Sequence, residues 1–189
     1  VLADLKGLEG LRAVPIMKSE SMPKPIMGVG VGNDGTVYVT ETIRQQREEI
    51  SLIQSPFLHR HCMAMDTTEA KRKWILDNYT SNIIGRQGVQ DYNKDGKIDI
   101  EDLSVRSEKI YTLEDSDGDG LYDQATLFAE GFNDLLTGCA HSVAPIGDHV
   151  YATIIPDLWK LTDSDGDGRA DRRESLAHGF APHIGYGNH

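Results

Sequence analysis

The chain has 189 residues, of which 39% are hydrophobic and 26% are charged, and its formal net charge is −11 at neutral pH. This length and composition predict one globular domain with a sizeable core. The sequence contains no apolar run of about 18 residues, so it predicts no membrane-spanning helix. The acidic balance argues against nucleic acid as a partner, because phosphates attract a basic surface.

The first pattern along the chain is that of a strand, a turn and a second strand. Residues 31–42, VGNDGTVYVTET, place Asn33-Asp34-Gly35 between alternating β-branched residues, which is typical of a hairpin. The glycines of Gly30–Gly35 also spell GxGxxG. A dinucleotide site of that type needs a helix after its glycines, whereas a strand pattern follows here. We therefore expect a hairpin and no nucleotide site.

Residues 43–107 look like a mostly helical insertion that ends in an acidic loop. Asp66-Thr-Thr-Glu69 resembles a capping box, which predicts a helix start. Apolar residues follow it at helical spacing: Ala70, Trp74, Ile75 and Tyr79. Cys62 in the insertion and Cys139 beyond it permit one disulfide or none, and the sequence does not choose between these.

Three short loops hold 13 carboxylates, and removing 13 negative charges from −11 would leave +2. The first loop has oxygen ligands at positions 1, 3, 5, 9 and 12 with glycine at position 6, as in the calcium loops of EF-hands and dockerin-type modules. The alternative is a solvated turn rich in Asp and Asn. The candidate ligands of the first loop are Asp91, Asn93, Asp95, the Lys97 carbonyl, Asp99 and Asp102.

The other two loops share the string DSDGDG, and each offers carboxylates at positions 1, 3, 5 and 9. The candidate ligands of the second loop are Asp115, Asp117, Asp119, the Leu121 carbonyl and Asp123. Those of the third loop are Asp163, Asp165, Asp167, the Arg169 carbonyl, Asp171 and Glu174. Position 12 of the second loop is Thr126, a poorer ligand, so we expect this site to be the weaker of the two. Both loops lie between predicted strands, which indicates structural calcium sites and not helix-opening sensors.

The two DSDGDG loops belong to an internal repeat. KIYTLEDSDGDGLYDQATLFAEGF, residues 109–132, superposes on DLWKLTDSDGDGRADRRESLAHGF, residues 157–180, at a shift of 48 residues. A second similarity, between residues 31–42 and 145–154, has a shift of 113 residues, so the first copy carries 65 extra residues. The second copy reads as four strands, VAPI, HVYATI, LWKL and ESLA, and four short strands at a period of about 40 to 50 residues indicate a propeller blade.

The predicted fold class is mainly β. It is a partial β-propeller of about two four-stranded blades, in which residues 1–189 form the N-terminal part of the ring and residues 43–107 form the helical insertion with its calcium loop. A propeller closes with about four or more blades. We therefore expect the chain to be incomplete as a folding unit, and further polypeptide or subunits to complete the ring.

The histidines with a candidate catalytic role are His183 and His189, in the glycine-rich string HIGYGNH after the last predicted strand. A propeller chain crosses there toward its central channel, where a histidine can accept a proton. Gly138-Cys139-Ala-His141 lacks the first cysteine of CxxCH, so this sequence predicts no covalent haem site of its own.

Several of these stretches resemble the membrane-bound dehydrogenase family common in Planctomycetes and Verrucomicrobia. Its members are β-propellers similar to quinoprotein sugar dehydrogenases, and they are often fused to a cytochrome c domain. About half of the chain carries the resemblance, in VGNDGTVYVTET, EKIYTLEDSDGDGLYDQATLFAEGFND, VYATIIPDLWKLTDSDGDGRADRRESLAHGF and HIGYGNH.

The resemblance implies a calcium-binding segment of an exported sugar or alcohol dehydrogenase, periplasmic or extracellular and membrane-associated through parts outside this sequence. In such enzymes a base assists hydride transfer to pyrroloquinoline quinone, and electrons pass to a cytochrome with haem c. The resemblance assigns no quinone-binding residue in this sequence, and we expect the segment alone to be inactive. The alternative is a non-enzymatic, calcium-stabilised binding or scaffold module. The expected cofactor is Ca²⁺ at three sites.

Overall fold

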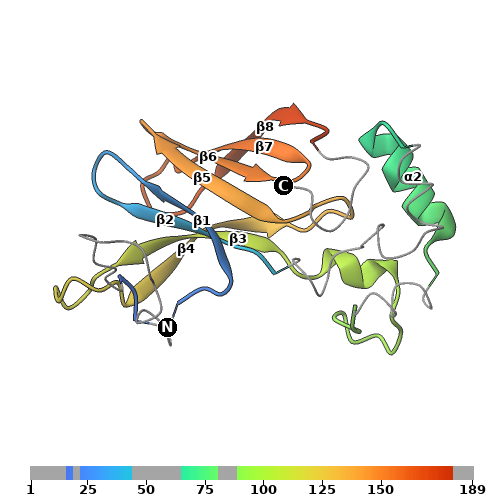
Figure 1. Cartoon of the computed structure of the whole chain (residues 1–189), viewed down its shortest axis with the longest axis horizontal. Coiled ribbons are helices and arrows are strands. Elements are labelled where there is room, and N and C mark those ends of the chain that lie inside the picture. Colours follow the sequence, from blue (N-terminus) through green and yellow to red (C-terminus); the bar gives the residue numbers. More distant parts are fainter. Residues whose placement is uncertain (1–15, 19–21, 44–64, 81–88, 181–189) are drawn as a thin grey trace, which may run out of the picture.

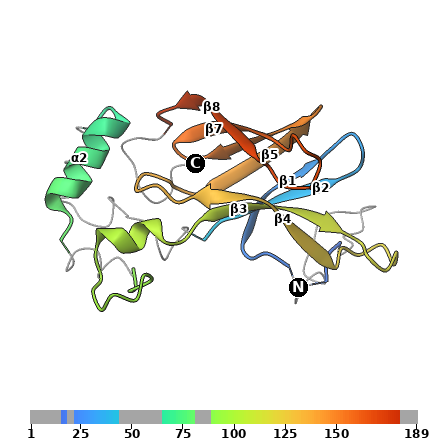
Figure 2. The ribbon, with the colours of Figure 1, turned by 180° about the vertical axis from the view of Figure 1, so that it is seen from behind.

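The structure, a computed structural model, describes residues 16–18, 22–43, 65–80 and 89–180. Its main feature is a pair of four-stranded antiparallel sheets, in each of which the strands follow chain order (Figures 1 and 2). The prediction of a mainly β fold is confirmed. The first sheet consists of β1 (Ile26–Val31), β2 (Val37–Glu41), β3 (Glu108–Glu114) and β4 (Gln124–Phe132). The second consists of β5 (Ala140–Ile146), β6 (His149–Ile154), β7 (Asp157–Thr162) and β8 (Arg172–His178).

The predicted turn at Asn33-Asp34-Gly35 joins β1 and β2, so the hairpin prediction is confirmed. Gly35 has φ of +89°, a left-handed conformation that glycine adopts without strain, and its N–H donates to the Gly32 carbonyl at 3.0 Å. A strand follows Gly35, which is the context that argues against a dinucleotide site.

The two sheets approach each other most closely where β1 runs past β5. Gly28 and Gly30 face the β5 backbone, and a Cβ atom would lie 2.2 Å from the His141 carbonyl oxygen at Gly28 and 2.4 Å from the Val143 carbonyl oxygen at Gly30. No side chain fits at those distances. The two glycines therefore permit the close approach of β1 to β5.

A hydrophobic core fills the space between the sheets. Tyr38 and Phe128 of the first sheet meet edge to face, with ring centroids 5.1 Å apart. The buried members of this core come from both sheets and are Ile110, Phe128, Ala129, Phe132, Ala140, Val143, Val150, Ala152, Ile154 and Leu161. Val37 and Val39, which alternate with Tyr38, join a second cluster on the opposite face of the first sheet.

The insertion leaves the first sheet after β2 and returns at β3. Its described elements are α2 (Thr68–Asn78) and the 3₁₀ helix η3 (Ile100–Ser104), which lie together at one end of the sheets (Figures 1 and 2). The predicted helix is confirmed, but its cap is Thr67 and not Asp66, since the Thr67 side chain accepts a hydrogen bond from the Ala70 N–H. In the described ranges, neither helix is long and apolar enough to cross a membrane.

Parts of the insertion lie outside the described residues, including Cys62, so the structure does not test its pairing with Cys139. Cys139 itself is buried. The described elements have their own small core, which packs Ile75 and Tyr79 of the α2 region against Leu103 of η3 and Leu136. The insertion thus contacts the sheets through the connection between β4 and β5, where Leu136 lies.

Candidate metal centres

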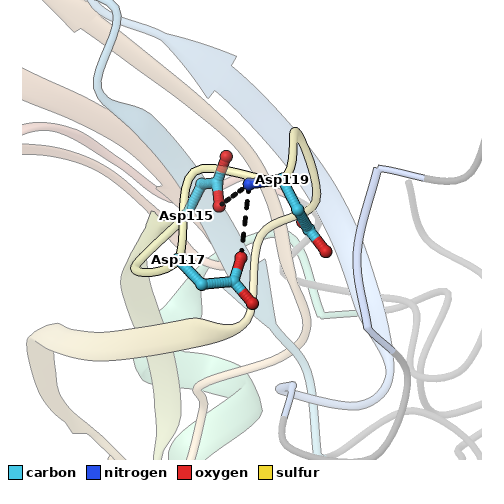
Figure 3. Close-up of side chains that lie close together, drawn as sticks. All are labelled: Asp115, Asp117 and Asp119. Carbon is cyan, nitrogen blue, oxygen red and sulfur yellow. Dashed lines mark hydrogen bonds between the residues drawn. The ribbon is translucent and has the colours of Figure 1, made fainter.

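The second acidic loop joins β3 to β4 and gathers three carboxylates. Side-chain oxygens of Asp115, Asp117 and Asp119 all lie within 4.8 Å of one another, and Figure 3 shows these side chains along the loop. The Asp119 N–H donates to Asp115 Oδ1 at 3.2 Å and to Asp117 Oδ1 at 3.3 Å, as the dashed lines indicate. Such a group of oxygens within reach of one point is what a hard cation requires.

Backbone N–H groups hold these carboxylates in place. The Gly120 N–H donates to Asp115 Oδ2 at 2.8 Å, and the Leu121 N–H donates to Asp119 Oδ1 at 2.9 Å. Gly120 has φ of +88°, so the glycine at position 6 permits the sharp turn that the sequence predicts.

The third loop, between β7 and β8, repeats this arrangement. Its carboxylate group consists of Asp163, Asp165 and Asp167. The Gly168 N–H donates to Asp163 Oδ2 at 2.9 Å and the Arg169 N–H to Asp167 Oδ1 at 2.8 Å, which are the same two bonds 48 positions later. Hydrogen bonds from backbone N–H groups, that of Gly168 first, lower the pKa of Asp163.

The aspartates at position 9 accept hydrogen bonds from the serines at position 2 of their loops. Asp123 Oδ1 accepts from the Ser116 N–H at 3.0 Å, and Asp171 Oδ1 accepts from the Ser164 N–H at 3.0 Å. The Ser164 hydroxyl also donates to Asp171, and it is the main reason that the pKa of Asp171 is lowered. Neither Asp123 nor Asp171 belongs to the groups of three that the structure brings together.

The position-12 residues of these two loops lie in strands. Glu174 is in β8, opposite Lys160, and Thr126 is in β4, opposite Thr112. The structure does not place Glu174 in the group formed by the three aspartates of its loop. Closure of the third site by Glu174 therefore stays a prediction.

The first loop has the same local hydrogen bonds. The Gly96 N–H donates to Asp91 Oδ2 at 2.9 Å, and the Lys97 N–H donates to Asp95 Oδ1 at 2.8 Å. Asp99 accepts from the Glu101 N–H and caps η3. The described residues of this loop include no group of three converging carboxylates.

Asp102, at position 12 of the first loop, is 1% exposed and serves the backbone. Its Oδ1 accepts from the N–H groups of Tyr92 at 2.7 Å and Asn93 at 3.1 Å, and its Oδ2 accepts from that of Asp99 at 3.0 Å. Burial raises the pKa of Asp102, but these three hydrogen bonds outweigh it and the net shift is downward. Asp102 thus stabilises the loop as an anion whether or not it binds a metal.

A lysine that the sequence pattern did not single out occupies the second loop. Lys18 Nζ lies 2.6 Å from Asp117 Oδ2, 3.1 Å from Asp119 Oδ2 and 3.5 Å from Asp123 Oδ2. The hydrogen bond from Lys18 is the first cause of the lowered pKa of Asp117. In the part of the chain that the structure describes, no lysine or arginine forms an ion pair with the three carboxylates of the third loop.

The third loop also contacts the first sheet. The Ala170 N–H, at position 8, donates to the Phe128 carbonyl of β4 at 2.8 Å. Arg169 lies 3.7 Å from Glu130, and Arg173 Nη1 donates to the Gly131 carbonyl at 3.0 Å. This loop therefore connects the two sheets in addition to closing its own hairpin.

Contacts of His178 with Asp157 and Thr68 link the second sheet to the insertion. His178 Nδ1 lies 2.8 Å from Asp157 Oδ1, and His178 Nε2 lies 2.9 Å from Thr68 Oγ1 at the start of α2, beside a cavity of about 440 Å³. Thr68 is only 5% exposed, so its hydroxyl is shielded and the contact positions the helix. The predicted catalytic candidates His183 and His189 lie outside the described residues.

Comparison with known proteins identifies the family. Residues 24–188 match the family described as "Domain of unknown function (DUF7133)". The chain belongs to this family. No curated protein matches the chain. No solved structure matches it either.

Proposed function

We propose that this DUF7133 chain is a calcium-binding β module whose second and third acidic loops each hold one Ca²⁺ ion, with a third ion in the first loop. The observation that carries the proposal is the repeated group of three converging carboxylates, braced by the same N–H bonds in Asp115–Asp119 and Asp163–Asp167.

The donor chemistry favours calcium among the common cations. All the candidate ligands are oxygens, whereas a zinc site would be expected to include cysteine or histidine. Three carboxylates within 4.8 Å of one another repel, and a bound divalent cation removes that repulsion. Calcium accepts the irregular oxygen shell that a nine- to twelve-residue loop offers, while magnesium requires nearly ideal octahedral geometry.

We further propose that the two sheets are neighbouring blades of a β-propeller. The support is that each sheet is a four-stranded antiparallel meander and that the loop contacts repeat as well as the strands. Ala170 N–H bonds the Phe128 carbonyl of the preceding sheet, and Tyr122, 48 positions earlier, bonds the Ile16 carbonyl at 2.8 Å. The segment at Ile16 thus contacts the second acidic loop of the first sheet in the same way that β4 contacts the third acidic loop of the second sheet. The coding sequence on either side of these residues tests this proposal, because a propeller requires further four-strand repeats.

The dehydrogenase activity stays a prediction from the resemblance. The cavity of about 890 Å³ at the ends of the sheets does not fit pyrroloquinoline quinone, an anionic, carboxylated cofactor, because four acidic side chains line it. These are Asp34, Glu114, Asp148 and Asp163. Calcium binding is common to the enzyme and to the alternative binding or scaffold module. The export, the haem c and the cytochrome partner likewise stay predictions.

Isothermal titration calorimetry on the chelator-treated chain tests the calcium proposal. We expect three Ca²⁺ ions to bind to the unmodified chain, and the stoichiometry to fall by one in Asp115→Ala and by one in Asp163→Ala. Asp148→Ala, at an exposed turn outside the loops, is the matched control and should leave it unchanged. Absence of binding heat and of any rise in melting temperature at millimolar calcium would contradict the proposal.

A further inference from the structure

We infer that Lys18 is a built-in counter-ion of the second acidic loop, and that Ca²⁺ binds there only by displacing the Lys18 ammonium group. The inference rests on the calcium binding proposed above. It adds a functional difference between two sites that share the string DSDGDG and the backbone bonds to its aspartates.

The geometry puts the two cations in competition. Lys18 Nζ is 2.6 Å from Asp117 Oδ2 and 3.1 Å from Asp119 Oδ2, so it already uses oxygens of two of the three converging carboxylates. A calcium ion needs those oxygens at about 2.3 to 2.6 Å. An ammonium group and a divalent cation cannot share them at these distances, because both the space and the charge repulsion forbid it.

The backbone keeps Lys18 at this loop. The Lys18 N–H donates to the Tyr122 carbonyl at 2.9 Å, and the Tyr122 N–H donates to the Ile16 carbonyl at 2.8 Å. The ammonium group therefore competes as a tethered, intramolecular ligand with a high effective concentration. After displacement the side chain can swing into solvent while these two backbone bonds remain.

The third loop makes the corresponding backbone contact, but the residue in the position of Lys18 is acidic. Ala170 there bonds the Phe128 carbonyl as Tyr122 bonds that of Ile16, so Glu130 holds the position that corresponds to Lys18. Glu130 lies 3.7 Å from Arg169 and brings no cation to the aspartates. The third site therefore has no competitor among the described residues. We expect it to fill first, and the second loop to keep its shape without calcium.

A calcium titration followed by ¹⁵N–¹H correlation spectra tests this loop by loop. The N–H groups of Gly96, Gly120 and Gly168 each bond the first aspartate of their loop and so give one reporter per site. We expect the Gly120 midpoint to lie about tenfold above that of Gly168, since displacing the ion pairs costs roughly what a tenfold change in affinity represents. Lys18→Met should lower the Gly120 midpoint by about the same factor and leave Gly168 unchanged.

Lys73→Met is the matched control, because Lys73 is exposed on α2 and pairs only with Asp77 among the described residues. It removes the same charge and should move neither midpoint. Thr126→Glu tests the other explanation of a weak second site, namely that Thr126 at position 12 is a poor calcium ligand. If Lys18→Met leaves the Gly120 midpoint in place while Gly168 responds to calcium, the inference is wrong and the calcium proposal stands. If none of the three glycines responds, the calcium proposal fails and the inference fails with it.

A second measurement uses the unmodified chain and does not depend on how the variant folds. Lysine acetylation read by mass spectrometry should find Lys18 protected relative to Lys73 in chelator, and equally reactive once calcium saturates the Gly120 signal. Continued protection of Lys18 at that calcium concentration would show that both cations bind together, which overturns the inference.

Discussion

Glu108 offers the sharpest test of how the sheets and the insertion are held together. It is fully buried at the start of β3, where its Oε1 accepts from the Ile43 N–H at 2.9 Å and its Oε2 accepts from the Ala140 N–H at 2.6 Å. One carboxylate thus joins the end of β2 to the start of β5. Hydrogen bonds to a charged group contribute about 1.5 to 3 kcal/mol each. We therefore expect Glu108→Ala to lower the free energy of unfolding by about 3 to 6 kcal/mol.

Glu108→Gln refines this test because it keeps the side-chain shape. Its amide group turns one acceptor into a donor that faces another N–H donor, so we expect a loss of about 2 to 3 kcal/mol. Glu114→Gln at the exposed end of the same strand is the control, with an expected change within about 0.5 kcal/mol. Urea unfolding in saturating calcium measures all three variants. If both Glu108 variants match the Glu114 control, Glu108 does not connect the sheets as argued.

Three further predictions concern the loops and the contact between sheets. Asp165→Ala should weaken calcium binding at the third loop more than Glu174→Gln, because Asp165 belongs to the converging group and Glu174 lies in β8; equal affinities by calorimetry would refute this ordering. Chelation should lower the melting temperature in scanning calorimetry, since each site at a hundredfold excess over its Kd adds about 2.7 kcal/mol, and an unchanged melting temperature would exclude calcium as a stabiliser. Gly28→Ala places a Cβ 2.2 Å from the His141 carbonyl oxygen, so we expect it to lower the free energy of unfolding in urea by about 2 to 3 kcal/mol. Gly147→Ala, whose Cβ meets nothing within 4 Å, should lower it by about 1 kcal/mol. Equal losses in the two variants would argue against the close approach of β1 and β5.

The sequence predicted those features whose causes are local. The hairpin at Asn33-Asp34-Gly35 and the α2 helix after Thr67 follow from turn chemistry, capping and periodicity. The four strands of the second copy were also predicted, because the repeat doubled the evidence for each of them. Many hydrogen bonds of the acidic loops join residues two to five positions apart, which spacing alone can anticipate.

The features that the sequence did not predict join distant residues. Lys18 meets Asp117 across 99 positions, and Glu108 meets Ala140 across 32. No periodicity signals which lysine enters an acidic loop or which glutamate is buried, because both depend on how the finished sheets pack. Asp102 is an intermediate case, since its position 12 indicated a metal ligand and the structure uses both of its oxygens for backbone N–H groups.

The long insertion between β2 and β3 leaves the first sheet intact, and the structure supplies the reason. Glu41 at the end of β2 is in register with Lys109 at the start of β3, so the two ends of the insertion emerge side by side. The bond from the Ile43 N–H to Glu108 then fixes both ends at the same point. Closing a loop costs entropy that grows only with the logarithm of its length, so replacing a two-residue turn by 65 residues costs only about 3 kcal/mol, which contacts that hold the two ends together can offset. The second sheet makes the same strand order with the two-residue turn between β6 and β7, Ile155-Pro156, and Pro156 stands 48 positions after Glu108. The buried carboxylate is therefore specific to the copy that carries the insertion, as a residue that fastens the ends of an insertion should be.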